Sequence, residues 1–569
     1  MRINRQFSRI VRTGCGVKNN LHMSTLQRYI KSPVLVTLLL ASAATVDAQD
    51  TLRKKEVNVT STFKPVLKDA AKINFNATAP AADTTRPKLQ YTIPNQNLSF
   101  GFQPGSLKPL ALQVDTGGKW SNESYVKIGY GSFKTPFAKA GISFGDGRNA
   151  GISIYAQHSS SKGKLPLQDY SNSAVDLAAF FKASKNMEWN VRFGGYQEQY
   201  NKYGYQPKTL TFPDDSVKVK FQTWRGRVSF HNINRTDLGI SYAPELKVDV
   251  FNDQLSNSES NTYINLPLEK SLGQTFAVNI ALTGNLSRYK PDGKTAIVNN
   301  SLSVAPSIFY KKPNVNVQAG IRPSWDNSNF KLFPNILAEF NSTDKRFSFQ
   351  VGWTGYLRNS GFQYQASLNP WIWAPATVYN TKIEERYAGF KGSVGDHFTY
   401  SAKVAFNKLN DQPLFVNDTM SGKSFRVVNE PELKVINFGG ELGYTVGEKF
   451  SLISNLSINQ YTAKLNDKAW GLLPLEWKTN MRLQVLKDLY VNSTLYTFDG
   501  PWSLTKAGKK NLPAAMDLSA GLEFKVVKNV KLWAQFNNIF NKEYQRWNQY
   551  PVYGFNFLGG VVFSFAQKN

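Results

Sequence analysis

The sequence contains a single cysteine among its 569 residues. This residue, Cys15, lies in an N-terminal region that we expect to be removed on export. The mature chain is then expected to have no disulfide bond, no thiol chemistry and no cysteine that could carry a lipid. Beyond one short N-terminal stretch, the sequence also lacks any run of about 18 consecutive apolar residues. These absences exclude a disulfide-stabilised secreted domain and a protein that crosses membranes with helices.

Histidine is also scarce, with four in the whole chain. Three of them, His158, His231 and His397, follow the expected leader, lie far apart and have no neighbouring residues at metal-ligand spacing. There is no Gly-x-Ser-x-Gly elbow, phosphate loop or dinucleotide fingerprint. Asp146-Gly147 and Asp292-Gly293 are better interpreted as turns than as calcium loops. We therefore expect no catalytic residues, no metal and no cofactor, although a site assembled across strands would leave no such spacing.

The N-terminal stretch that contains the only long apolar run has the anatomy of a signal peptide. Arg28 and Lys31 supply positive charge, residues 34–44 form the apolar core, and Val46-Asp47-Ala48 is a small-residue cleavage site. The run is too short for a membrane helix. We expect residues 1–48 to comprise an extension and this leader, with Met23 as the start of translation.

The C-terminal stretch from Tyr553 onward, YGFNFLGGVVFSFAQKN, alternates in character at every second residue. Its apolar positions are Phe555, Phe557, Gly559, Val561, Phe563 and Phe565. The residues between them are mostly small or polar. Because successive side chains of a strand point to opposite faces, this pattern predicts a strand with one Phe-rich face turned to lipid.

The same alternation recurs upstream. It is clear in the segments Phe276–Ser287, Arg346–Gly355, Asp517–Val526 and Val530–Asn537. A lumen-facing polar residue at every second position explains why the mean hydropathy, −0.37, is that of a polar chain.

The connections expected between these strands fall into short turns and long loops. Short turns are predicted at Gly145-Asp146-Gly147, Gly395-Asp396, Gly447-Glu448 and Val527-Lys528-Asn529. Longer polar connections are predicted at Gln197–Lys218, Asn252–Gln274 and Thr497–Pro513. Short turns on one side and long loops on the other are typical of outer-membrane barrels, whose long loops face outward.

We therefore predict an all-β fold, a transmembrane antiparallel β-barrel over residues 119–569. About 20 residues for each strand with its connection give about 20 to 22 strands, or as few as about 14 if some hairpins lie outside the membrane. A soluble sandwich or propeller is the alternative. The leader, the terminal strand and the 12 Trp, 26 Tyr and 38 Phe favour a barrel in the bacterial outer membrane.

The chain is strongly basic, with a formal net charge of +28. One interpretation is that loop and rim lysines contact phosphorylated lipid and lipopolysaccharide headgroups; the other is a lumen that attracts anions. We favour the first, because Lys and Arg are spread evenly along the strands. The same even spread argues against nucleic acid as a partner.

The C-terminal 36 residues resemble the end of TonB-dependent receptors. In that family the penultimate strand ends in a phrase like N-L-F-N-K-x-Y, and a Pro-containing turn then leads into a final strand of the type G-R-x-F-x-x-G-x-x-x-x-F. The matching residues that we single out are Asn538, Phe540, Asn541, Tyr544, Pro551, Gly554, Phe557 and Phe565. One departure is that Phe565 is followed by four more residues. The resemblance implies the barrel fold and its location more than an activity.

The N-terminal segment departs from the family. Glu56, Val57, Val59 and Thr60 resemble the short box that pairs by strand addition with the TonB-type energy transducer. Residues 49–118 are otherwise Pro-, Ala- and Thr-rich, as in an extended linker. The resemblance implies a plug of well over a hundred residues, which does not fit here, so we expect a reduced or absent plug.

These features leave two functions open. The first is transport of a substrate through the lumen, energised by a TonB-type transducer or assisted by a lipoprotein partner. The second is a non-transporting barrel, either a scaffold subunit of an envelope complex or a passive porin. Fold alone does not decide between them.

Overall fold

The structure, a computed structural model, describes residues 123–184 and 186–566 of the chain. The expected leader and the box residues Glu56, Val57, Val59 and Thr60 lie outside this range. Among the described residues, none of the helices is long and apolar enough to span a membrane.

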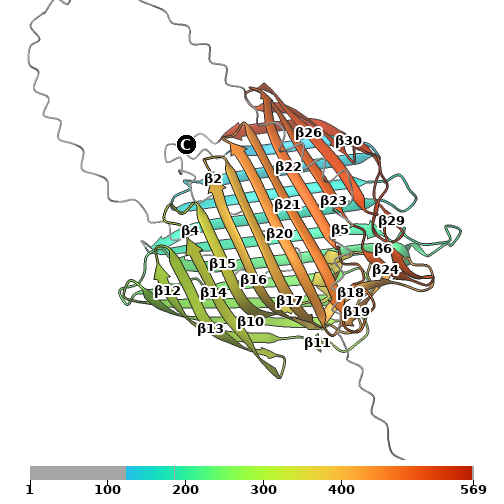
Figure 1. The fold of residues 1–569 in the computed structure, drawn as a ribbon. Coiled ribbons are helices and arrows are strands. Elements are labelled where there is room, and N and C mark those ends of the chain that lie inside the picture. The colour runs from blue at the N-terminus through green and yellow to red at the C-terminus, as the bar shows by residue number, and fades with distance from the viewer. Residues whose placement is uncertain (1–122, 185, 567–569) are drawn as a thin grey trace, which may run out of the picture. The chain divides into compact units, whose positions relative to one another are not determined.

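The described residues form a closed antiparallel barrel of 22 strands (Figure 1). This architecture confirms the predicted all-β transmembrane barrel, and the number of strands falls at the upper end of the range expected from the sequence. The barrel strands are β1 (Glu123–Gly131), β2 (Thr135–Gly145), β3 (Ala150–Ser161), β4 (Tyr170–Ser184), β5 (Met187–Asn201), β6 (Lys218–Asn232), β8 (Glu245–Asp253), β9 (Ser258–Leu272), β10 (Phe276–Lys290), β12 (Ser301–Lys312), β13 (Val315–Asp326), β14 (Asn329–Asn341), β15 (Phe347–Asn359), β16 (Asn380–Val394), β17 (Phe398–Asn410), β20 (Leu433–Val446), β21 (Phe450–Ala463), β22 (Leu475–Leu486), β23 (Leu489–Phe498), β26 (Ala515–Val527), β27 (Val530–Asn537) and β30 (Asn556–Ala566).

Two short segments extend barrel strands past an interruption. β7 (Ile240–Tyr242) continues the position of β8 beside β9, and the two are separated at Pro244, which has no N–H to donate to the ladder. β11 (Ile297–Val298) continues the position of β12 beside β10. The sheet therefore contains 24 strand segments arranged as 22 barrel strands.

The barrel closes where the first and last strands pair, from Glu123 opposite Ala566 to Gly131 opposite Leu558. Near this seam the indole of Trp533, on the neighbouring β27, covers Gly129 and donates from Nε1 to the Ile128 carbonyl at 3.1 Å. A Cβ on Gly129 would meet this indole, whereas a Cβ on Gly560 would meet the Ile128 carbonyl. The seam thus depends on glycine for its close approach.

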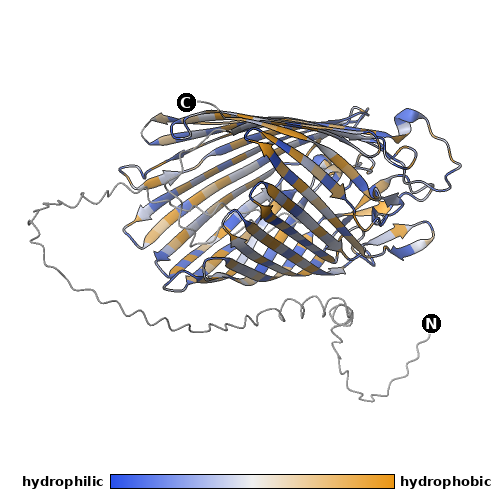
Figure 2. Cartoon of the chain, turned by 90° about the horizontal axis from the view of Figure 1, so that it is seen from above, coloured by the Kyte–Doolittle hydropathy of each residue, from blue (hydrophilic) through white to orange (hydrophobic). Residues whose placement is uncertain are grey.

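The apolar side of each strand faces outward, as the alternation predicted. In the last strand Phe557, Phe563 and Phe565 are 39–46% exposed. Figure 2 shows hydrophobic and hydrophilic residues alternating along the strands. Large apolar side chains are likewise exposed along all the remaining barrel strands except β21 and β23. A belt of this kind is stable only against lipid, so the closed barrel places the protein in the bacterial outer membrane.

The lumenal face of the wall carries charge of both signs in pairs. The residues between the outward-facing positions form these ion pairs, four of them across neighbouring strands and two across strands further apart. The pairs include Lys127–Glu523 (3.4 Å), Arg192–Asp176 (3.2 Å), Arg225–Asp249 (2.7 Å), Arg227–Glu245 (3.0 Å), Lys311–Glu269 (2.5 Å) and Lys403–Glu385 (2.7 Å). These basic wall residues are therefore neutralised by acidic partners across the lumenal face.

The two ends of the barrel differ as the turn signals indicated. The four short turns at 145–147, 395–396, 447–448 and 527–529 all join barrel strands at the end where β1 begins and β30 finishes. By the convention of outer-membrane barrels this end is periplasmic. Most longer connections lie at the other, outer end; 233–244 is a long connection at the periplasmic end.

One predicted connection was wrong. Asn252–Gln274 was expected to be a loop, but Ser258–Leu272 is the full-length strand β9, and only residues 254–257 form the turn before it. Its Ser, Asn and Glu residues and Pro267 weaken the sequence signal for a strand. Pro267 is accommodated because it lies opposite the interruption between β7 and β8, where Ala243 N–H donates to its carbonyl at 3.4 Å.

Candidate functional site

Six connections at the outer end fold together, and we call them the loop cap: residues 202–217, 360–379, 411–432, 464–474, 499–514 and 538–555. Five of them contain short elements of their own, several of which are labelled in Figure 1. These elements are α3 (Asp214–Val217), α4 (Phe362–Leu368), the hairpin β18 (Gln412–Asn417) and β19 (Phe425–Glu430), the hairpin β24 (Trp502–Thr505) and β25 (Gly508–Asn511), and the pair β28 (Gln545–Trp547) and β29 (Tyr550–Pro551).

The cap has a hydrophobic core that joins distant parts of the barrel wall. Wall residues of β6, β8 and β10 pack in one cluster with cap residues from the connection after β5, which neighbours β6, and from the connections after β15, β17 and β27, which lie further around the barrel. The cluster includes Phe221, Phe251 and Tyr289 from the wall, and Tyr203, Phe362, Ile372, Phe415, Phe425, Trp547 and Tyr550 from the cap. Buried apolar packing of this kind holds the loops across the outer mouth.

Tyr550 lies at the centre of this core and is only 2% exposed. Its ring stacks on Trp371 with the ring centroids 4.0 Å apart, and it meets Tyr203 edge-on at 4.9 Å. Its hydroxyl donates to the carbonyl of Lys423. One side chain thus ties together three connections that are far apart in sequence.

Backbone hydrogen bonds between loops add to the packing. They connect four pairs of cap segments much as strands are connected in a sheet. The bonds run from Phe425 N–H to Trp371 O (3.0 Å), Trp373 N–H to Phe425 O (2.9 Å), Gln206 N–H to Ser421 O (3.0 Å), Phe415 N–H to Trp470 O (3.1 Å) and Gly471 N–H to Trp502 O (2.8 Å). The cap is therefore a folded unit rather than a set of independent loops.

The C-terminal residues that carry the family resemblance build the last loop of the cap. Asn538 is buried and has a φ of 47°, and its side-chain amide donates to the carbonyls of Lys542 and Tyr553, both at 2.8 Å. Asn541 accepts from the Phe555 N–H at 2.8 Å, and a Cβ on Gly554 would meet its side-chain oxygen. These three residues fix the two ends of loop 538–555 to each other.

The remaining residues of this group occupy different surroundings. Tyr544 donates to Asp517 of β26 at 2.9 Å, and the Pro551 carbonyl accepts from Tyr203 at 2.9 Å. Phe540, Phe557 and Phe565 are exposed on the outside. The structure brings Asn538, Asn541, Tyr544, Pro551 and Gly554 together in one loop. Their contacts hold the loop in its fold and do not form a reactive site.

Two lysines of the cap are largely buried, and neither forms an ion pair among the described residues. Lys202 is 3% exposed and Lys423 is 8% exposed. The Lys202 ammonium lies 4.2 Å from the ring centre of Trp373, and that of Lys423 lies 3.7 Å from the ring centre of Phe212. Burial and the neighbouring charge of Lys423 lower the pKa of Lys202 to about 8. Burial also lowers the pKa of Lys423.

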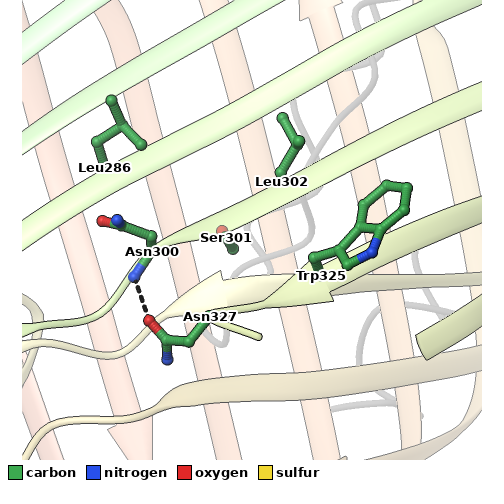
Figure 3. Close-up of a pocket in the computed structure, with 6 residues that line it drawn as sticks. All are labelled: Leu286, Asn300, Ser301, Leu302, Trp325 and Asn327. Atoms are coloured by element: carbon green, nitrogen blue, oxygen red, sulfur yellow. Dashed lines mark hydrogen bonds between the residues drawn. The ribbon is translucent and has the colours of Figure 1, made fainter. Parts of the chain in front are cut away.

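The outer wall carries a shallow depression near the outer rim, with a volume of about 370 Å³ (Figure 3). It is lined by Leu286, Asn300, Ser301, Leu302, Trp325 and Asn327. The Asn300 N–H donates to the Asn327 side chain at 2.8 Å, which fixes its polar edge. None of these side chains titrates or is a nucleophile of a known catalytic arrangement. In residues 123–184 and 186–566 there is also no group of three His, Cys, Asp or Glu residues arranged to hold a metal ion.

Sequence reasoning did not identify the cap core or its lysines. Aromatic residues in polar connections were the available signal, since Tyr203, Trp371, Trp547 and Tyr550 all lie outside alternating strands. Such residues are expected either to contact ligand or to pack, and only the structure distinguishes the two.

No protein-family model matches this chain, and no curated protein matches it by sequence. Solved structures do resemble it. The FrpB iron transporter from Neisseria meningitidis (F3-3 variant) has a TM-score of 0.60 at 11% identity, covering 79% of this chain and 82% of that one. The siderophore receptor PirA from Acinetobacter baumannii has a TM-score of 0.59 at 10% identity, covering 78% and 80%. The copper transporter OprC has a TM-score of 0.58 at 13% identity, covering 79% and 81%.

At these identities the likeness concerns the fold. It confirms that the chain has the barrel architecture of TonB-dependent receptors, as its C-terminal residues suggested. Of these neighbours, FrpB and OprC are described as transporters and PirA as a receptor.

Proposed function

We propose that this protein transports a solute across the outer membrane, with the barrel lumen as the path and the loop cap as its outer gate. The observation that carries the proposal is the cap: a 22-strand wall encloses a space too wide for its own side chains to fill, and the outer mouth is covered by loops with a buried core. A structural neighbour that transports iron and another that transports copper support the same use of the barrel.

The energy source forms a second part of the proposal. Glu56, Val57, Val59 and Thr60 would pair by strand addition with a TonB-type transducer, and the rest of 49–118 would act as a reduced plug. No metal or organic cofactor is needed for such a role, and we propose no catalytic activity. Lipopolysaccharide and lipid headgroups would contact the basic rim.

A scaffold in an envelope complex is the second candidate. The specific observation in its favour is that the cap is cross-linked by backbone hydrogen bonds and a common core, whereas loops that capture ligands are generally mobile. A scaffold would keep the cap closed at all times, whereas a transporter must open it.

A reversible lock on the cap separates the two. Gln206 and Ser421 are joined by a backbone hydrogen bond of 3.0 Å across the mouth, and the chain has no cysteine other than Cys15. Backbone-bonded neighbours of this kind lie within reach of a disulfide. We would therefore introduce Gln206→Cys and Ser421→Cys together and measure ionic current through the mature protein in planar bilayers.

If the cap is a gate, the reduced double variant opens intermittently and the oxidised form does not, while each single-cysteine variant behaves like the unmodified chain. Current that persists through the oxidised form would show that the cap is not the gate. Complete closure in both redox states, including for a chain without residues 49–118, would favour the scaffold.

A further inference from the structure

The loop cap brings together two lysines that form no ion pair, with the carboxylates of Asp253 and Asp418 acting on them only through space. Lys202 follows β5, and Lys423 precedes β19 in a connection from the other side of the mouth. Among the described residues, neither ammonium donates a hydrogen bond or forms an ion pair; each instead lies over an aromatic ring. Both Nζ atoms keep some contact with solvent, so a soluble ligand could reach them.

Several contacts hold the two lysines near each other. Tyr550 packs against Tyr203, the residue after Lys202, and its hydroxyl bonds the Lys423 carbonyl. The Gln206 N–H donates to Ser421 O, two residues before Lys423. The ring under Lys202, Trp373, is itself bonded through its backbone N–H to Phe425. Both lysine stems are therefore anchored to the same small region of the cap.

The nearby carboxylates are already occupied. Asp418 accepts backbone N–H groups of Met420 and Ser421 on one oxygen and that of Ser424 on the other, at 2.9–3.0 Å. Asp253 caps the turn before β9, accepting the backbone N–H groups of Leu255 and Asn257 at 2.9 Å and the Asn257 amide at 2.8 Å. Both act on Lys202 only through space, as does Lys423.

The two ammonium groups repel each other, and an anion that contacts both of them would relieve this repulsion. A third amine, that of Lys208, is close to this region and donates to the Tyr203 carbonyl at 2.7 Å. The surrounding rings of Trp373, Phe212 and Tyr205 would give such a ligand apolar walls.

We propose that Lys202 and Lys423 form a binding site in the loop cap for a compact oxyanion, a phosphate, sulfate or carboxylate group carried by a soluble ligand. That this anion is part of the transported solute rests on the proposed function; the binding site itself does not.

The test is calorimetric titration of the purified protein with sodium phosphate and with sodium sulfate against sodium chloride at matched ionic strength. The variants are Lys202→Met and Lys423→Met. The control is Lys509→Met, which removes a half-exposed cap lysine that pairs with Asp467 at 2.6 Å. Circular dichroism and heat-dependent gel mobility would establish that each variant is a folded barrel.

We expect both oxyanions to bind the unmodified protein, each lysine variant to weaken binding by about tenfold or more, and the control to leave it unchanged. Sulfate keeps its charge over the relevant pH range, so its affinity should fall as the pH rises through about 8, where Lys202 loses its proton. No binding of either oxyanion, or equal binding by all four proteins, would overturn the proposal.

Two further measurements identify the source of the anion and separate this proposal from the transport proposal. Binding of phosphatidic acid in micelles without binding of free phosphate would contradict a soluble ligand. Oxyanion binding together with a cap that never opens in the disulfide experiment would retain the site and reject transport.

Discussion

Replacement of Tyr550 by alanine tests whether the core of the cap keeps the outer mouth closed. This side chain is nearly fully buried, stacks on Trp371 and bonds the Lys423 carbonyl. Removing a buried aromatic side chain typically costs about 3–5 kcal/mol. Because the ring contacts cap residues and not the barrel seam, we expect this loss to fall on closure of the cap rather than on assembly of the barrel.

The magnitude follows from the equilibrium between closed and open caps. A loss of about 3–5 kcal/mol raises the ratio of open to closed forms by roughly 10²-fold to several times 10³-fold. Tyr550→Phe keeps the ring and loses only the hydrogen bond, about 1 kcal/mol, and should raise the ratio about fivefold. Comparison of Tyr550→Ala with Tyr550→Phe therefore separates the contribution of ring packing from that of the hydrogen bond.

Open probability in planar bilayers measures this ratio directly, and protease cleavage within residues 411–432 gives an independent measure. Met420→Ala is the control, because Met420 belongs to the same connection and is 91% exposed. A Tyr550→Ala barrel that is folded by heat-dependent gel mobility, yet opens no more often than the Met420→Ala protein, would refute the idea that this core holds the cap.

Three further outcomes are expected. Gly560→Ala should prevent barrel closure, seen as loss of the heat-modifiable band, because its Cβ would meet the Ile128 carbonyl at the seam, whereas Gly521→Ala, with its nearest atom at 3.7 Å, should fold. Asn538→Ala should destabilise loop 538–555 by about 2–4 kcal/mol in hydrogen exchange, and Asn538→Gly should recover only the part due to its positive φ. Without anion, the free energy of unfolding should rise by roughly 3 kcal/mol between pH 8 and 10.5, because the unfolded chain keeps a proton that folded Lys202 releases. The thermal midpoint should rise with it, and Lys202→Met should abolish the rise.

The barrel could be predicted from the sequence because its signal is local. Alternation in segments such as Val530–Asn537 shows which residues face lipid, and short turns show where neighbouring strands join. β9 was missed since polar residues interrupt its lipid-facing positions and Pro267 lies among the alternate, inward-facing ones. The place of Pro267 depends on a break in the neighbouring strand. That break is a property of the assembled sheet rather than of the segment.

The cap could not be predicted for a different reason. Its bonds join residues that no local pattern relates, as in the hydrogen bond from Tyr203 to the Pro551 carbonyl across 348 positions of sequence. Aromatic residues in loops indicate either packing or ligand contact, and only their mutual arrangement shows that Trp371, Tyr203 and Tyr550 share one core. The proximity of Lys202 and Lys423 likewise exists only because the loops meet.

Closure of the cap and occupancy of the proposed anion site are coupled by their shared residues. Tyr550 holds the Lys423 backbone and packs beside Lys202, so opening the cap at this point separates the two lysines. An anion that binds both ammonium groups in the closed cap therefore favours closure by RT ln(1 + [L]/Kd), about 1.4 kcal/mol at ten times Kd. Phosphate should accordingly lower the open probability of the Tyr550→Ala barrel about tenfold, and by no more than about twofold when Lys202→Met is added. A rise in current with phosphate would instead mean that the site forms only in the open cap, and release of the ligand would then accompany closure.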